Sequence, residues 1–263
     1  APEGAEIHLA DVTSFDQMVQ LLNNIDVVYH LANTVLNVAR RQPHFAVKLD
    51  ILGTTNILEA CVKNDVKKII YASSFYVYDG LLNNLKVDEN WRSDIFKTEM
   101  FGITKLVCER LVLEYNRLHG LKYVILRYGP VYGSSDRCTS AIFEFIKTGL
   151  RGDPLVIWGS GERKNQYTYV EDIAEGSVKA LPFENEIFNL VSPEYVKIRQ
   201  IAEFLSKKYG FKVEYDLSKQ EGPSMPYISP KKAMDKLQWN PTRLEEGIEK
   251  TAKLSSLLVS VKS

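Results

Sequence analysis

Hydrophobic positions in the first half of the chain follow two different periods. Residues 26–32 are apolar throughout their middle. By contrast, Phe15, Met18 and Leu22 recur at helical spacing. The first pattern is typical of a strand covered on both faces, and the second of an amphipathic helix. Applied along this half, the same reasoning predicts strands over 5–10, 26–32, 67–73 and 122–127, and helices over 14–22, 43–63 and 98–119.

The order of these elements predicts the architecture. Strand and helix alternate at the spacing of right-handed βαβ crossovers, which indicates an α/β fold with a parallel sheet. We predict a sheet domain over residues 1–133 and a smaller α/β lobe over 134–263, with some elements of the second half returning to the sheet. In that half we expect helices over 139–148, 171–180, 198–209 and 244–258, and strands over 154–158, 187–190 and 211–215.

Composition narrows the function classes. The 263 residues are 45% hydrophobic and carry 33 basic and 33 acidic groups, so no global field favours nucleic acid or an anionic membrane. We find no apolar run of about 18 residues and no signal-peptide pattern. Cys61, Cys108 and Cys138 are far apart, as in a reducing cytosol, and the four histidines do not cluster. We therefore expect a cytoplasmic protein with no metal site.

Candidate chemistry gathers where the third predicted strand ends and the helix over 98–119 begins. The strand delivers Ser73 and Ser74, and Lys105 follows Phe101 by one helical turn. Residues four apart lie on one face of a helix, so Phe101 and Lys105 point to the same side. This stretch is the candidate active site.

Motifs along the rest of the chain have the order and spacing of one family. Together they resemble the extended short-chain dehydrogenases/reductases, specifically the NAD-dependent epimerase/dehydratase family that acts on nucleotide sugars. The resemblance implies a Rossmann-like sheet domain that binds NAD and a C-terminal substrate lobe. The matching segments are Ala10-Asp11-Val12, His30-Leu31-Ala32-Asn33, Leu52-Gly53-Thr54-Thr55-Asn56, the spacing of Ser74 and Tyr78, Arg127 to Gly133, Gly159-Ser160-Gly161, Tyr169-Val170-Glu171-Asp172 and Leu237-Gln238-Trp239-Asn240-Pro241.

The resemblance also implies roles for individual residues. In this family a tyrosinate takes a proton from a sugar hydroxyl while hydride passes to nicotinamide, and a nearby lysine lowers the tyrosine pKa and holds the ribose. The corresponding catalytic positions are Ser74, Phe101 and Lys105. The implied cofactor contacts are Asp11, Val12, Leu31, Ala32, Ala72, Ser73, Lys105, Tyr128, Pro130 and Val131. The implied substrate contacts are Asn33, Ser74, Tyr76, Arg163 and Asn165.

The first of three departures from the family pattern concerns proton transfer. Phe101 stands where the family has its tyrosine, and phenylalanine cannot exchange a proton. The loss of a positioned acid or base typically costs about 10²–10⁴ in rate. Tyr76 and Tyr78 are candidate substitutes near Ser74, although packing at the strand end is the simpler interpretation of both. Whether Phe101 is natural or engineered stays open.

The other two departures concern ligand contacts. The family's glycine-rich turn, which places pyrophosphate at a helix N-terminus, does not occur. We therefore expect that the sequence starts just before the family's third strand, either as a truncated chain or as a fold completed by another chain. Pro130 replaces a frequent asparagine, and Asn165 replaces an arginine that pairs with phosphate. Arg163 and Lys164 are candidate replacements for that arginine.

Three functions stay open on this reasoning. The first is an NAD-dependent epimerase or dehydratase of a nucleotide-activated sugar, slowed by Phe101. The second is a catalytically silent relative that binds a nucleotide or a partner. The third is a dehydrogenase of a non-nucleotide alcohol, which would form NADH in net amounts. NADP is not excluded as the cofactor. The resemblance further implies a homodimer through the helices over 43–63 and 98–119.

Overall fold

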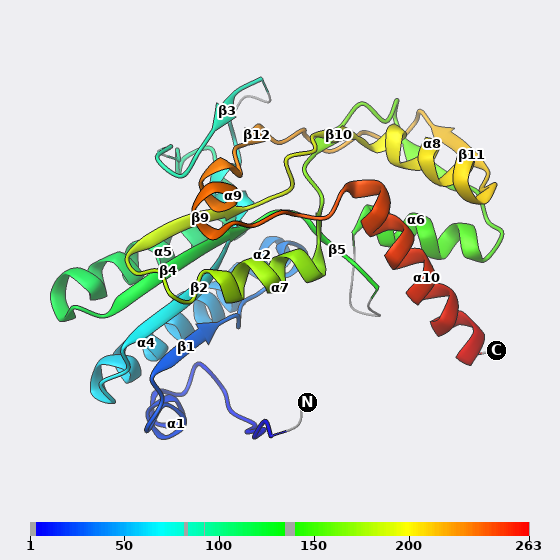
Figure 1. Cartoon of the computed structure of the whole chain (residues 1–263). Coiled ribbons are helices and arrows are strands. Elements are labelled where there is room, and N and C mark those ends of the chain that lie inside the picture. The colour runs from blue at the N-terminus through cyan, green and yellow to red at the C-terminus, as the bar shows by residue number, and fades with distance from the viewer. Residues whose placement is uncertain (1–3, 82–83, 92, 135–139, 263) are drawn as a thin grey trace. The chain divides into compact units, whose positions relative to one another are not determined.

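The computed structural model describes residues 4–81, 84–91, 93–134 and 140–262 (Figure 1). The chain divides into two compact units. Unit 1 comprises residues 1–80, 92–127 and 180–188, and unit 2 comprises 81–91, 128–179 and 189–263. The predicted boundary at residue 133, with cofactor and substrate assigned to its two sides, stays a prediction.

A four-stranded sheet forms the centre of unit 1. Its strand order is β1 (Val27–His30), β2 (Lys68–Ser74), β4 (Lys122–Tyr128) and β9 (Glu186–Leu190). β1 and β2 run parallel, with Val27 opposite Lys68. The α/β fold with a parallel sheet is thus confirmed, and three of the four strands predicted in the first half are present. The fourth strand of the sheet, β9, comes from the second half of the chain.

Helices α1 (Phe15–Leu21), α4 (Gly53–Lys63) and α5 (Met100–His119) supply the apolar core of unit 1 together with the sheet. Leu58, Ile69 and Ile125 are fully buried at its centre. α5 ends at Gly120, whose φ of 71° is the left-handed conformation that glycine adopts without a steric penalty. Most apolar positions predicted for these helices therefore face the core, whereas Leu118 at the end of α5 is exposed.

The helix predicted over 43–63 is three consecutive pieces. α3 (Pro43–Ala46) leads into a π-helix, η1 (Val47–Leu52), and then into α4. A further helix, α2 (Leu36–Arg41), precedes them and was not predicted. π-helical turns are rare and occur frequently at functional sites. This one carries Asp50, whose side chain is buried.

The strand predicted over 5–10 is wrong. No residue of this segment lies in a strand, and Ile7 and Leu9 are almost wholly exposed. An alternating apolar pattern forms a strand only where a second strand accepts its backbone hydrogen bonds. Within the described ranges, no strand pairs with residues 5–10.

Unit 2 combines short strand pairs with longer helices. Its core packs α6 (Ala141–Leu150), α8 (Ile198–Tyr209) and α10 (Leu244–Lys262) around buried Ile146, Leu205 and Ile248. Residue 139, where a helix was predicted to start, lies outside the described residues. The paired strands are β6 (Leu155–Trp158) with β11 (Val213–Asp216), β5 (Val131–Tyr132) with β8 (Thr168–Tyr169), β7 (Lys164–Asn165) with β10 (Val196–Lys197), and β3 (Lys86–Val87) with β12 (Tyr227–Ile228). The remaining helices are α7 (Val170–Lys179) and α9 (Lys231–Leu237).

A glycine lets α5 approach the end of β2. The strand continues into a 3₁₀ turn, η2 (Phe75–Tyr78), which packs on the start of α5. A Cβ atom added to Gly102 would lie 2.4 Å from the Tyr76 carbonyl oxygen and 2.4 Å from the Thr98 methyl group. The backbone oxygen cannot move away cheaply, so a larger residue would push the helix off the turn.

We expect Gly102→Ala to lower the free energy of unfolding by about 1–3 kcal/mol, the usual cost of overpacking. Urea denaturation measures this loss. Gly222→Ala is the control, because a Cβ atom there would meet its nearest neighbour, an Arg163 guanidinium nitrogen, at 3.4 Å. Equal stability of Gly102→Ala and the unmodified chain would contradict the proposed close approach.

Candidate active site

Ser74 lies at the junction of β2 and η2. Its side chain is buried, and its Oγ accepts a hydrogen bond from the Tyr76 backbone N–H at 3.3 Å. The hydroxyl therefore caps the 3₁₀ turn that follows the strand. Because the oxygen acts as acceptor in this contact, the hydroxyl hydrogen can still be donated to a ligand. Ser74 thus has the geometry of a serine that binds a substrate oxygen.

Lys105 points from α5 toward the same strand end. Only 2% of it is exposed, and its Nζ donates to the Ala72 carbonyl oxygen at 2.7 Å. The ammonium lies 5.1 Å from the ring centre of Tyr71 and 5.9 Å from that of Phe101. Burial lowers the pKa of Lys105 to about 8, because a low-dielectric environment disfavours the charged form.

Phe101 occupies the first turn of α5 beside this lysine. It is buried and packs with Ala39 and Ala46, and the ring of Tyr76 meets it edge to face at 5.5 Å. The predicted positions Ser74, Phe101 and Lys105 therefore gather where β2 ends and α5 begins. The contacts of Phe101 are those of an aromatic core residue, and its ring has no proton to exchange.

Tyr78 cannot readily supply that proton. It is fully buried, and its hydroxyl accepts a hydrogen bond from the Arg127 guanidinium at 2.7 Å. Arg127 in turn holds Glu109 through two hydrogen bonds of 2.9 and 2.7 Å, and Ser73 donates to the same carboxylate. Buried charges are stable only when they are paired, so this group fixes β2, β4 and α5 to one another. Ser73 thus has a structural contact, and its predicted role at the cofactor stays a prediction.

The Gly-Thr-x-Asn segment of α4 holds the end of β1 and the segment before α1. Thr54 Oγ1 lies 2.9 Å from His30 Nε2, and Asn56 donates to the Val12 carbonyl oxygen at 3.0 Å. At Gly53, a Cβ atom would meet the Val12 side chain at 2.9 Å. Burial lowers the pKa of His30 to about 3, with a further decrease from the charge of Lys105. His30 is therefore a neutral, buried residue.

Predicted ligand residues lie on both sides of β1, with Asp11 before it and the cofactor contacts Leu31 and Ala32 and the substrate contact Asn33 after it. Leu31 is 56% exposed, Ala32 is exposed, and Asn33 donates from its side chain to the Leu31 carbonyl oxygen at 2.7 Å. Asp11 is exposed, and hydrogen bonds from the Thr13 backbone and side chain lower the pKa of its carboxyl. These residues are accessible to a ligand.

The structure adds residues that sequence reasoning missed. Asp50, Thr34 and Thr104 form a buried cluster, in which the two threonines donate to the Asp50 carboxylate. Glu109 joins Arg127 and Ser73, as described above. The sequence did contain one signal for these residues, because Asp50 and Glu109 are acidic residues within predicted amphipathic helices. A buried Asp or Glu needs polar partners, so such a position predicts a buried polar cluster.

The predicted ligand residues of unit 2 lie around β5 and β7. Tyr128 shares a hydrogen bond of 2.9 Å with Ser177, and Pro130 and Val131 are half-buried. Asn165 is buried, and its Oδ1 accepts from the Gln166 backbone N–H at 3.3 Å. The Arg163 Nε is buried, and none of the described residues accepts a hydrogen bond from it.

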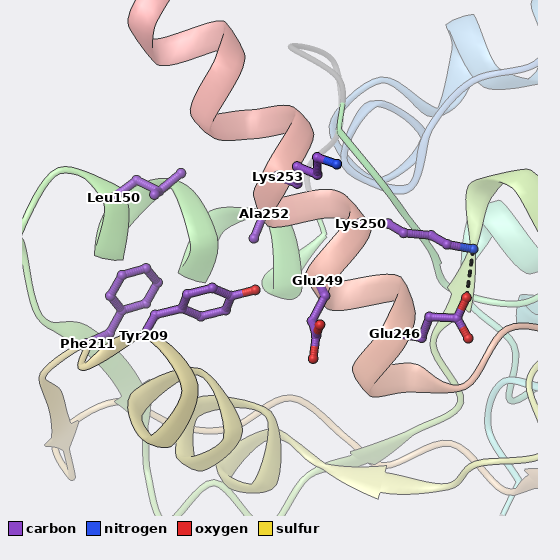
Figure 2. A pocket seen from close by; sticks show the side chains of 8 residues that line it. All are labelled: Leu150, Tyr209, Phe211, Glu246, Glu249, Lys250, Ala252 and Lys253. Atoms are coloured by element: carbon purple, nitrogen blue, oxygen red, sulfur yellow. Dashed lines mark ion pairs between the residues drawn. The ribbon is translucent and has the colours of Figure 1, made fainter.

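Unit 2 also contains an open hollow of about 530 Å³ (Figure 2). Its wall includes the stacked rings of Tyr209 and Phe211, and Glu246 pairs with Lys250 beside it. No residue predicted from the sequence as part of the site lines the hollow. The lining residues are Leu150, Tyr209, Phe211, Glu246, Glu249, Lys250, Ala252 and Lys253.

Other predicted features concern metals, membranes and cysteines. Over the described ranges, no group of three His, Cys, Asp or Glu side chains could hold a metal ion. The helices in those ranges include none that is long and apolar enough to cross a membrane. Cys61 and Cys108 are buried and unpaired with each other, whereas Cys138 lies outside the described residues.

Comparisons with known proteins point to one family. Residues 1–190 match the model of the NAD dependent epimerase/dehydratase family. A protein of Methanocaldococcus jannaschii, named as a putative UDP-glucose 4-epimerase, is 33% identical over 255 residues, which cover 94% of this chain and 82% of that protein.

Two solved structures are similar over nearly the whole chain. UDP-glucose 4-epimerase from Thermotoga maritima, solved with UDP-glucose, is 25% identical with a TM-score of 0.90, over 98% of this chain and 87% of that one. UDP-glucuronic acid 4-epimerase from Bacillus cereus, solved with UDP-glucuronic acid and NAD, is 31% identical with a TM-score of 0.82, over 95% of this chain and 81% of that one.

Burial of Lys105 predicts a measurable effect on stability. Its folded-state pKa of about 8 lies below the ordinary value of 10.5. Between pH 8 and pH 10.5, the lysine is therefore mostly protonated in the unfolded chain and mostly neutral in the folded one. The lysine therefore destabilises the fold below pH 8, and this cost disappears as the pH rises toward 10.5. We expect Lys105→Met to raise the free energy of unfolding at pH 7 by about 3 kcal/mol.

Urea denaturation of both proteins at pH 7 and pH 10 isolates this contribution, because other titrating groups cancel in the difference. We expect the advantage of Lys105→Met to shrink at pH 10. An advantage that is the same at both pH values would show that Lys105 is not a buried charged group.

Proposed function

The chain belongs to the NAD dependent epimerase/dehydratase family, and we propose that it binds NAD and a UDP-sugar and is built for reversible hydride transfer between them. The observation that carries the proposal is the position of buried Lys105 beside Ala72, at the strand end that also presents Ser74. A buried ammonium lowers stability, so its presence points to a role in binding or catalysis. The named relatives are epimerases of UDP-sugars.

The residues at this strand end suit the nicotinamide half of NAD. The Lys105 ammonium has three N–H groups, one of which donates to Ala72, so it can also donate to ribose hydroxyls. Exposed Leu31 and Ala32 offer an apolar surface after β1, and Asp11 offers an exposed carboxylate for amino or hydroxyl groups. Bound NAD would supply the hydride acceptor. The donor set does not discriminate NAD from NADP.

The side chains of the site are suited to bind a sugar hydroxyl, but the ring at position 101 cannot accept its proton. Ser74 accepts a hydrogen bond from the Tyr76 backbone N–H, which leaves its hydroxyl hydrogen for a substrate oxygen. Phe101, where a tyrosinate would take the proton, presents only a ring. We propose that the chain holds substrate and cofactor with little turnover, and that Asn33 and Tyr76 are further substrate contacts.

A UDP-sugar also needs partners for its diphosphate. In unit 2, we propose Arg163 for this role, because its guanidinium charge suits a phosphate. Asn165, at the position of the family's arginine, is buried and neutral. The proposed phosphate contact, Arg163, therefore lies two residues before the position at which the family has its arginine.

Restoring the phenol tests the proposal directly. We expect Phe101→Tyr to raise epimerisation of UDP-glucose or UDP-glucuronic acid by about 10²–10⁴ in rate, because it supplies the missing acid/base one turn from Lys105. Chromatography of the sugar products with added NAD measures the rate.

The control is Phe101→Tyr combined with Lys105→Met, which removes the charge that lowers the tyrosine pKa and should abolish the gain. If Phe101→Tyr binds both ligands but leaves the rate unchanged, the site is not assembled for this reaction. If neither ligand binds to any of these proteins, the catalytically silent relative becomes the better account. Net formation of NADH would favour the dehydrogenase of a non-nucleotide alcohol.

We also propose that the chain forms a homodimer through the segments over 43–63 and 98–119. Four large apolar side chains are exposed on them, which supports an interface: Phe45, Val47, Leu52 and Leu118. Light scattering after size-exclusion chromatography is expected to give twice the chain mass. Val47→Glu should shift this mass to that of one chain, whereas Leu217→Glu, at an exposed leucine outside these segments, should not. A single-chain mass for the unmodified protein would contradict the proposal.

A further inference from the structure

Glu221 is a half-buried acid of unit 2 to which the proposed function gives no role. It lies in the loop before β12, and its carboxylate faces the turn between β6 and β7. Its Oε1 accepts from the Ser160 backbone N–H at 2.8 Å and from Ser160 Oγ at 2.9 Å, and its Oε2 accepts from the Arg163 backbone N–H at 2.7 Å. One carboxylate therefore holds both ends of the turn.

The backbone of this turn is shaped to receive an anion. Gly159 and Gly161 have φ values of 63° and 71°, in the left-handed region that glycine tolerates. A Cβ atom added to Gly159 would lie 2.7 Å from Glu221 Cγ, so the turn approaches the carboxylate closely. Neighbouring backbone N–H groups in such turns form a concave anion site. Here the chain supplies the anion itself.

The charge of Glu221 strengthens this attachment. Burial acts to raise the pKa of its carboxyl, but the hydrogen bonds from Arg163 and Ser160 outweigh burial, and the pKa lies below its ordinary value. The group is therefore ionised at neutral pH. Hydrogen bonds to an ionised acceptor are stronger than those between neutral groups, so this carboxylate holds the turn more firmly than an amide or a hydroxyl could.

Arg163 is the residue of the turn whose position these contacts determine. Its backbone N–H is held by Glu221, and its carbonyl oxygen accepts from the Ile198 N–H, at the start of α8, at 3.0 Å. Its guanidinium lies beside Gly222, where an added Cβ atom would be 3.4 Å from the nearest guanidinium nitrogen. The loop that carries Glu221 therefore contacts both the main chain and the side chain of Arg163.

We infer that Glu221 is a positioning residue, which fixes the 159–163 turn and thereby orients Arg163 toward the diphosphate of the substrate. A direct contact between Glu221 and the diphosphate is excluded by their like charges, since both are anions. Its effect on binding therefore passes through Arg163. The role of Arg163 rests on the proposed function, whereas the attachment of the turn to Glu221 does not.

The affinity for UDP, measured by isothermal titration calorimetry, tests the inference. We expect Arg163→Ala to raise the Kd by about 10–100-fold, the usual effect of losing a hydrogen bond to a charged group. Glu221→Ala should raise it by a similar factor. The variant with both substitutions should bind UDP no more weakly than the weaker of the two single variants, because residues that act as one unit are not additive.

The matched control is Glu214→Ala, which removes an exposed carboxylate from β11 in the same unit and so makes the same change in net charge. It should leave the Kd for UDP unchanged. Losses that add up in the double variant would overturn the inference, because they would show that Glu221 acts independently of Arg163. Tighter binding of UDP by Glu221→Ala would also overturn it, because the carboxylate would then repel the ligand.

Hydrogen exchange of the Ser160 and Arg163 amides, followed by NMR without ligand, tests the attachment of the turn separately. We expect exchange to become about tenfold faster or more in Glu221→Ala, and to stay unchanged in Glu214→Ala. Unchanged exchange in Glu221→Ala would refute the attachment. Glu221→Gln, which keeps the side-chain volume but only one acceptor oxygen, should give a smaller increase and serves if Glu221→Ala does not fold.

The two measurements also separate this inference from the proposed function. If exchange responds to Glu221→Ala but the unmodified chain does not bind UDP, the proposed function fails while the attachment of the turn stands. If the unmodified chain binds UDP and Arg163→Ala weakens this binding while Glu221→Ala does not, the proposed function stands and the positioning role of Glu221 is wrong.

Discussion

The candidate site depends on one unfavourable placement, the charged end of Lys105 inside unit 1. Burial makes this ammonium easier to deprotonate, and the site compensates with the Ala72 carbonyl oxygen and the faces of two aromatic rings. A methionine in the same place would stabilise the fold, so retention of a lysine there favours a role in function.

The arrangement separates binding from proton transfer. Ser74 caps the turn after β2 and can still donate to a substrate, and Lys105 can donate to a ribose. Position 101, where a proton would be exchanged, is filled by a ring that packs against Tyr76. The nearby Tyr78 is committed to Arg127 in the core. This strand end therefore supports the proposed binding of substrate and cofactor, and it presents no phenol at position 101.

How much could be predicted from the sequence depended on how local each feature is. β2 and α5 were predictable because long, regular apolar patterns define them, and Ser74, Phe101 and Lys105 followed from their positions on these elements. The break of the 43–63 helix at η1 was not predictable, because a π-turn changes the hydrogen-bond register without interrupting the mixed apolar and polar pattern of the segment. The Glu109–Arg127–Tyr78 group joins residues 18 and 49 apart, which no local period reveals. Residues 5–10 have the pattern of a strand but lack a paired neighbour.

The most direct test is the affinity of the unmodified chain for NAD as a function of pH. Because the lysine holds its proton below a pKa of about 8, the account predicts tight binding at pH 7 that weakens as the pH rises through this value. Equilibrium dialysis at pH 7 and pH 9.5 measures the two dissociation constants. The same dissociation constant at both pH values, or no binding at either, would contradict the claim that the charge of Lys105 holds the cofactor.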